Sequence, residues 1–67
     1  MNIAPVLYTI SVDGHLGPTL LSAFPAMAVR QEGSRTLLTG LLDQPALFGV
    51  LAEVEALGLC LVEVRRS

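Results

Sequence analysis

Two neighbouring polar residues, Asp13 and His15, are the strongest candidates for chemistry in this chain of 67 residues. His15 is the only histidine, and it stands two positions after Asp13 in a glycine-rich stretch. Because an imidazole changes its charge near neutral pH, the pair could act as a general acid and base or as a proton switch. The same spacing would also occur without catalysis if His15 were a solvated turn residue and Asp13 shaped the turn. Catalysis by His15 and Asp13 is therefore the alternative to a non-enzymatic function.

Cys60 is the second candidate, because it is the only cysteine of the chain. No internal disulfide can form from one cysteine, and a reducing cytoplasm is the expected compartment. Cys60 alternates with Val62 and Val64, which predicts a buried thiol rather than a reactive nucleophile. Neither Cys60 nor the pair of Asp13 and His15 belongs to a set of three or four ligands, so we expect no metal and no cofactor.

The composition limits the classes of function that remain. Hydrophobic residues make up 52% of the chain and charged residues 15%, with a mean hydropathy of +0.65. A domain of this size buries only about 60% of the surface of its unfolded chain, so a second subunit should cover part of the apolar surplus. The formal net charge is −2 and lysine is absent, which argues against a nucleic-acid partner. No segment approaches the roughly 20 apolar residues that cross a bilayer, so we expect no membrane partner.

Residues 6–13 supply the first predicted strand. Large apolar side chains alternate there with small or polar ones, and the apolar set should face a core: Val6, Tyr8, Ile10 and Val12. A turn at residues 14–17 leads into a short helix, because Pro18 suits the first position of a helix. Pro25 disfavours helical geometry at the residue before it, so this helix should end near Phe24 after about two turns.

Residues 27–32 and 35–41 predict a β-hairpin. Gly33-Ser34 joins them, and glycine at the first central position is typical of a type II′ turn. A two-residue turn also sets the register, in which Glu32 pairs with Arg35 across the hairpin.

Residues 42–59 carry the most complete helix pattern of the chain. Apolar residues recur there at spacings of three and four, which places them on one stripe: Leu47, Val50, Leu51, Val54 and Leu57. Asp43 is the expected N-cap, and Gly58 the expected left-handed residue that ends the helix in a Schellman motif. Residues 59–66 then predict a last strand, with Cys60 and the two valines that follow it on the core side.

The order strand, helix, strand, strand, helix, strand predicts an α+β fold in one domain that spans residues 1–67. Two right-handed crossovers interleave as a split βαβ, or ferredoxin-like, sandwich. We expect a four-stranded antiparallel sheet of order 4-1-3-2 with both helices on one face. The second face of the sheet should then have no helix over it, and we call it the open face.

The run Val12-Asp13-Gly14-His15-Leu16-Gly17-Pro18 resembles the first strand-to-helix turn of ACT domains, which are small ferredoxin-like regulatory modules that bind amino acids. This resemblance implies a small metabolite bound at a subunit interface, with the ligand near Gly14, His15, Leu16 and Gly17. The whole chain, above all residues 43–51 and 58–66, is also similar to a group of short uncharacterised bacterial proteins. No activity follows from that second resemblance.

The open face is the predicted interaction surface. Apolar and threonine side chains occupy its centre, and the predicted interface comprises Leu7, Thr9, Leu37, Thr39 and Leu61. The charged residues fall on the two edge strands, which resembles an apolar interface core within a polar rim. No aromatic residue on this face could stack on a base, which again argues against RNA. The sequence thus favours a non-enzymatic module that forms a homodimer or larger homo-oligomer, or docks on a protein partner. Its alternative is a small oligomeric isomerase or cyclase.

Overall fold

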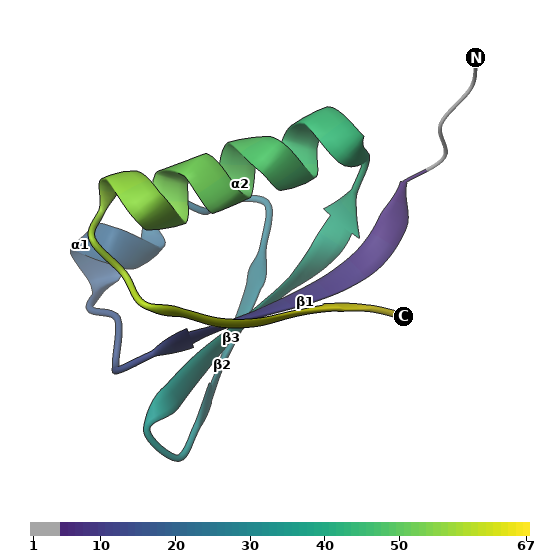
Figure 1. Cartoon of the computed structure of the whole chain (residues 1–67). Coiled ribbons are helices and arrows are strands. Elements are labelled where there is room, and N and C mark those ends of the chain that lie inside the picture. The colour runs from purple at the N-terminus through teal and green to yellow at the C-terminus, as the bar shows by residue number, and fades with distance from the viewer. Residues whose placement is uncertain (1–4) are drawn as a thin grey trace.

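A computed structural model describes residues 5–67, and this part of the chain contains six elements (Figure 1). They are β1 (Val6–Asp13), α1 (Pro18–Leu21), β2 (Ala28–Glu32), β3 (Arg35–Leu42), α2 (Gln44–Ala56) and β4 (Leu61–Arg66). The strands form one antiparallel sheet in the order β2-β3-β1-β4, which is the order 4-1-3-2 read from the opposite edge. The α+β class is confirmed.

The core lies between the sheet and the two helical segments, which are on the same face of it (Figure 1). Its buried side chains come from β1, β3, α2 and the α1–β2 connection: Ile10, Val12, Phe24, Met27, Leu38, Leu42 and Val54. The stripe predicted for α2 packs toward this core, with Val54 buried and the other members half-buried. We call this side of the sheet the covered face.

The alternation of β1 follows the prediction. Ile10 and Val12 are fully buried on the covered face, and Tyr8 is half-buried against the same core. Leu7 and Asp13, which belong to the other set, are exposed. A strand with one apolar set buries that set against whatever packs on its face, and here that is α2.

The β2–β3 hairpin has the predicted register, with Glu32 opposite Arg35 and Val29 opposite Leu38. Gly33 has a φ of +61°, whereas no residue other than glycine has a positive φ within residues 5–67. A positive φ at the first central position alone is the requirement of a type II′ turn. The turn therefore sets the register by local geometry.

Both ends of α2 carry the predicted caps. Asp43 Oδ1 accepts a hydrogen bond from the backbone N–H of Ala46 at 2.9 Å. Gly58 has a φ of +72°, and the N–H of Leu59 donates to the carbonyl of Val54 at 3.0 Å. That hydrogen bond closes a Schellman motif, which satisfies a carbonyl at the end of the helix.

The first helix is shorter than predicted. α1 ends at Leu21, and the N–H groups of Ala23 and Phe24 donate to carbonyls only three residues back. Gly17 caps α1 without a side-chain hydrogen bond, so one end of the helix lacks the support that Asp43 gives to α2. The prediction of two turns is wrong, although Phe24 is buried as expected.

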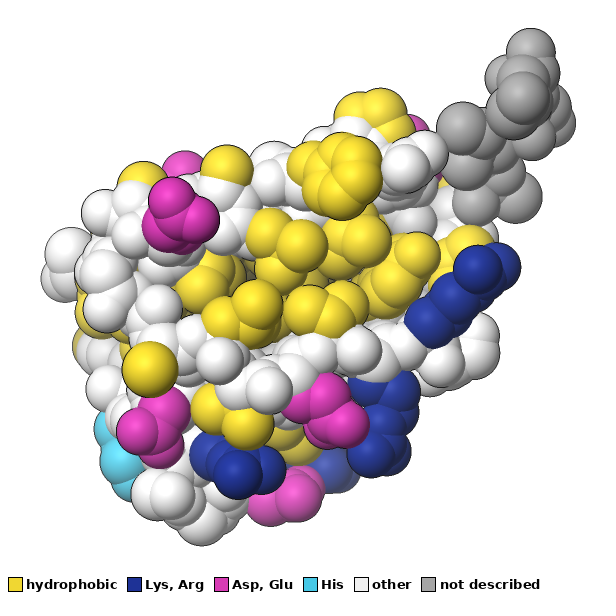
Figure 2. Space-filling view, in the orientation of Figure 1, with side chains coloured by type: hydrophobic (Ala, Val, Ile, Leu, Met, Phe, Trp, Pro, Cys, Tyr) yellow, Lys and Arg dark blue, Asp and Glu magenta, His cyan; other side chains and the backbone are white. Residues whose placement is uncertain are grey.

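The last strand is also placed differently. It begins at Leu61, all of its residues are exposed, and Cys60 is exposed rather than buried in the core. β4 pairs only with β1 and stands at the margin of the core, which α2 forms over β1 and β3. Figure 2 shows an apolar band between α2 and β4 on this side. We call it the α2–β4 seam and define it by three exposed residues: Phe48, Val62 and Val64.

Candidate interaction surface

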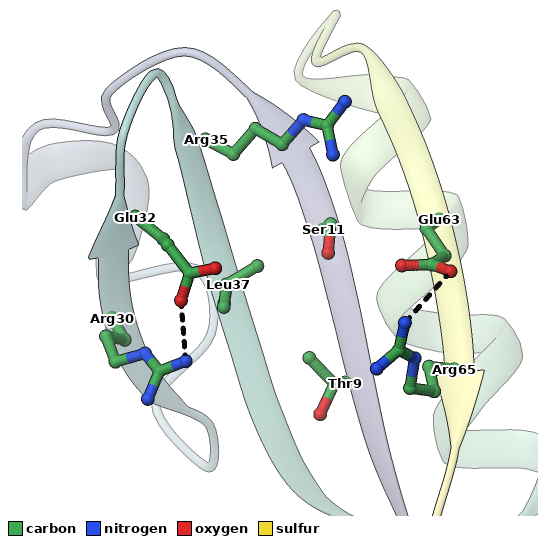
Figure 3. Close-up of a pocket in the computed structure, with 8 residues that line it drawn as sticks. All are labelled: Thr9, Ser11, Arg30, Glu32, Arg35, Leu37, Glu63 and Arg65. Atoms are coloured by element: carbon green, nitrogen blue, oxygen red, sulfur yellow. Dashed lines mark hydrogen bonds and ion pairs between the residues drawn. The ribbon is translucent and has the colours of Figure 1, made fainter.

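The open face of the sheet is framed by two ion pairs, one on each edge strand (Figure 3). On β2, Arg30 Nη2 donates to Glu32 Oε2 at 2.7 Å. On β4, Arg65 Nη2 lies 3.5 Å from Glu63 Oε2. All four side chains are well exposed to solvent, so each pair stabilises the fold by only about 0–1 kcal/mol. Their effect is to place opposite charges at both margins of the face.

Between the two ion pairs the face is hollowed into a trough of ≈ 350 Å³. In addition to the paired residues, it is lined by Thr9, Ser11, Arg35 and Leu37. Ser11 lies on β1 at the centre of the face, and only 5% of its surface is exposed (Figure 3). The guanidinium of Arg35 reaches from β3 across β1. We call this region the arginine trough.

The other end of the open face is apolar. Leu7 on β1 and Leu41 on β3 are direct cross-strand neighbours, with exposed fractions of 40% and 69%. Thr9 and Thr39 form the next outward-facing pair, with their hydroxyl oxygens 3.4 Å apart. We call Leu7 and Leu41 the leucine end. The predicted interface omitted Leu41, although the alternation that selects Thr39 also selects it.

Four of the five predicted interface residues lie on the open face, and Leu61 does not continue their pattern. The pairing of β1 with β4 shifts between Ser11 and Val12, so that Glu63 is opposite Ser11 but Leu61 is opposite Val12. Val12 belongs to the covered face, where it is fully buried. The irregularity thus breaks the alternation on which the assignment of Leu61 to the open face depended.

The structure does not bring Asp13 and His15 together as an acid–base pair. Both side chains are exposed, and no hydrogen bond within residues 5–67 joins them. The hollow on the open face is lined by other residues of β1, β2, β3 and β4.

The turn that the ACT resemblance marked as a ligand site is anchored to the hairpin. Gly14 has a φ of +96°, its N–H donates to the carbonyl of Ser34 at 2.7 Å, and its carbonyl accepts from Thr36 Oγ1 at 2.7 Å. Leu16 is half-buried and packs against the core. Gly17 precedes a helix of only four residues. These contacts anchor Gly14 to the hairpin and Leu16 to the core.

No three histidine, cysteine, aspartate or glutamate side chains gather as a metal site would require in the part of the chain that the structure describes. Within the same residues, none of the helices is long and apolar enough to cross a membrane. The surface features described so far are the arginine trough, the leucine end and the α2–β4 seam.

A family profile described as "Domain of unknown function (DUF8691)" matches residues 7–65, from the start of β1 almost to the end of β4. The chain belongs to this family. No curated protein and no solved structure matches the chain. The family description assigns no function, so the chain's own surface is the only guide to one.

Proposed function

We propose that this protein is a small non-enzymatic module of ferredoxin-like topology that forms a homodimer through the open face of its sheet. The strand order β2-β3-β1-β4, with one helical segment in each of the two crossovers, supports the ferredoxin-like assignment. The family profile covers all six elements, which favours a module that acts as one unit.

The leucine end is the observation that carries the proposal. Leu41 is more exposed than any other large hydrophobic residue of the described chain, and Leu7 lies directly beside it. Removing a leucine side chain from water stabilises an assembly by about 1.5–3 kcal/mol. A symmetric dimer buries the same patch of both copies, so each of these two leucines contributes twice.

The remainder of the open face is compatible with such an interface. The half-buried Thr9, Leu37 and Thr39 continue from the leucine end toward the arginine trough, and the two ion pairs stand at the edges. Two sheets stack at about 10 Å, a distance that lets side chains of this size meet.

Sedimentation velocity at tens of micromolar tests this proposal. We expect a wild-type dimer, and a monomer for Leu41→Glu, because a charge at this position would be buried without a partner in the interface. Phe48→Glu is the matched control, since Phe48 is 58% exposed but belongs to the α2–β4 seam. This variant should remain dimeric.

A monomeric wild type would refute the proposal outright. A dimer that Leu41→Glu leaves intact and Phe48→Glu dissociates would refute the open-face contact and place the interface at the α2–β4 seam.

A further inference from the structure

We propose that the arginine trough binds a small carboxylate with a single negative charge, and that Arg35 is the residue that pairs with it. Binding does not require the homodimer proposed above, but the trough shares Thr9 and Leu37 with that contact, so the site is tested on the monomer.

Arg35 brings a positive charge to the trough that no other side chain of the described residues neutralises in an ion pair. Three arginines line the trough, and two of them are paired with glutamates of their own strands. Arg35 makes no ion pair with any residue of the described chain, including its cross-strand neighbour Asp13. A guanidinium offers a planar fork of N–H groups that matches a carboxylate in a bidentate contact. Arg35 is therefore the open cationic position of the trough.

The second argument is the hydroxyl of Ser11. Only 5% of the surface of this residue is exposed. None of the side-chain hydrogen bonds within residues 5–67 involves its hydroxyl, although Ser11 lines the trough (Figure 3). No buried side-chain oxygen or nitrogen of the described chain lacks a hydrogen-bond partner, so the Ser11 hydroxyl is an atom that solvent reaches from the trough. A hydroxyl in this position can donate to a ligand oxygen.

The charges around Arg35 select the class of anion. Glu32 and Glu63 stand on opposite sides of the trough, and their carboxylates repel additional negative charge. A monocarboxylate needs only the one cation that Arg35 supplies, whereas a phosphate dianion would be left partly uncompensated. Leu37 adds an apolar wall for a short alkyl chain. The volume of ≈ 350 Å³ is within the range of small-molecule pockets.

The test is an NMR titration of ¹⁵N-labelled protein at constant ionic strength with propionate, its neutral isostere propionamide, and inorganic phosphate. Propionate should shift the amide signals of Ser11, Arg35 and Leu37, and bind at least about tenfold more tightly than propionamide or phosphate. Arg35→Gln should weaken propionate binding by about tenfold or more. Ser11→Ala should weaken it about fivefold, the equivalent of one hydrogen bond.

Arg66→Gln is the matched control. Arg66 is an exposed arginine of β4, but it pairs with Tyr8 of the covered face and does not line the trough. Its replacement should leave propionate binding within about twofold of wild type.

Three results would overturn the inference: equal responses to propionate and propionamide, phosphate binding as tight as propionate binding, or full affinity in Arg35→Gln. Sedimentation of the same samples keeps the two proposals apart. A wild-type monomer that binds propionate would refute the homodimer alone. A monomeric Leu41→Glu variant, whose trough is uncovered, would refute the carboxylate site alone if it gave no response to propionate.

Discussion

The two faces of the sheet use alternate residues of the same strands, yet they differ in what covers them. On the covered face, the cross-strand partners Ile10 and Leu38 are fully buried. On the open face, the partners Leu7 and Leu41 are equally apolar but exposed. Alternation therefore decides which side chains share a face, whereas the packing of other elements decides whether water is excluded from that face.

The largest expected difference comes from shortening one leucine on each face of β3. Leu38→Ala should lower the free energy of unfolding by about 2–5 kcal/mol, because it leaves a cavity in a small core. Leu41→Ala should change the stability of the isolated subunit by no more than about 0.5 kcal/mol. Urea denaturation at a protein concentration where the subunit is monomeric measures both. Equal losses in the two variants would mean that the faces are not distinct as described.

Gly40 and Gly49 lie in contrasting surroundings, which gives a second prediction. A Cβ on Gly40 would lie 2.7 Å from Met27 Sδ and 3.3 Å from the carbonyl oxygen of Ala26. Gly40→Ala should therefore cost about 1–3 kcal/mol through overpacking of the covered face.

Gly49 is its control, since a Cβ there meets nothing within 4 Å and the residue lies inside α2. Gly49→Ala should stabilise the protein by about 0.5–1 kcal/mol through the higher helix propensity of alanine. Thermal melts of both variants give the signs directly. A stabilising Gly40→Ala would show that β3 and the α1–β2 connection are not in close contact.

The third prediction concerns the cap that holds α2 over the covered face. Asp43→Ala removes the hydrogen bond to Ala46 and should cost about 0.5–2 kcal/mol. Asp43→Asn retains an acceptor at the N-cap, so its stability should stay close to wild type. Chemical denaturation separates the two variants. If both lose the same stability, the charge of Asp43 matters and its capping hydrogen bond does not.

The smallest effect is expected at the ion pairs that frame the open face. Glu32→Gln and Glu63→Gln should each change the stability by about 0–1 kcal/mol, because the paired side chains are exposed and their attraction is screened by water. Whatever difference exists should shrink in thermal melts at high salt. A loss comparable with that of Leu38→Ala would mean that the open face contributes to folding as strongly as the core.

Much of the fold could be predicted because its signals are local. The capping acceptor of Asp43, the left-handed glycines at positions 33 and 58, and the alternation of β1 each act within a few residues. The hairpin register also follows from its two-residue turn. These features depend on backbone geometry and nearest neighbours, so a single sequence is enough to identify them.

The candidate surface could be predicted only in part. Leu7, Thr9, Leu37 and Thr39 were identified by strand alternation, and the same rule applied to Leu41 would have completed the leucine end. The arginine trough was not predicted, because its residues come from all four strands and meet only through their lateral pairing. Alternation along one strand contains no information about which residue of the next strand lies opposite.

The sequence alone is enough to predict the order of the elements, the ends of α2, the hairpin register and the alternation of β1. The burial and pairing of β4 required the tertiary structure. This strand lies at the margin of the core, and Cys60 and Val62 are exposed. Its pairing with β1 is irregular, so Leu61 does not continue the alternation of Glu63 and Arg65. The physical reason is that burial depends on the area that a helix can cover, and a helix of 13 residues over β1 and β3 leaves an edge strand partly bare. An irregularity in strand pairing likewise results from fitting two strands together, which neither strand specifies alone.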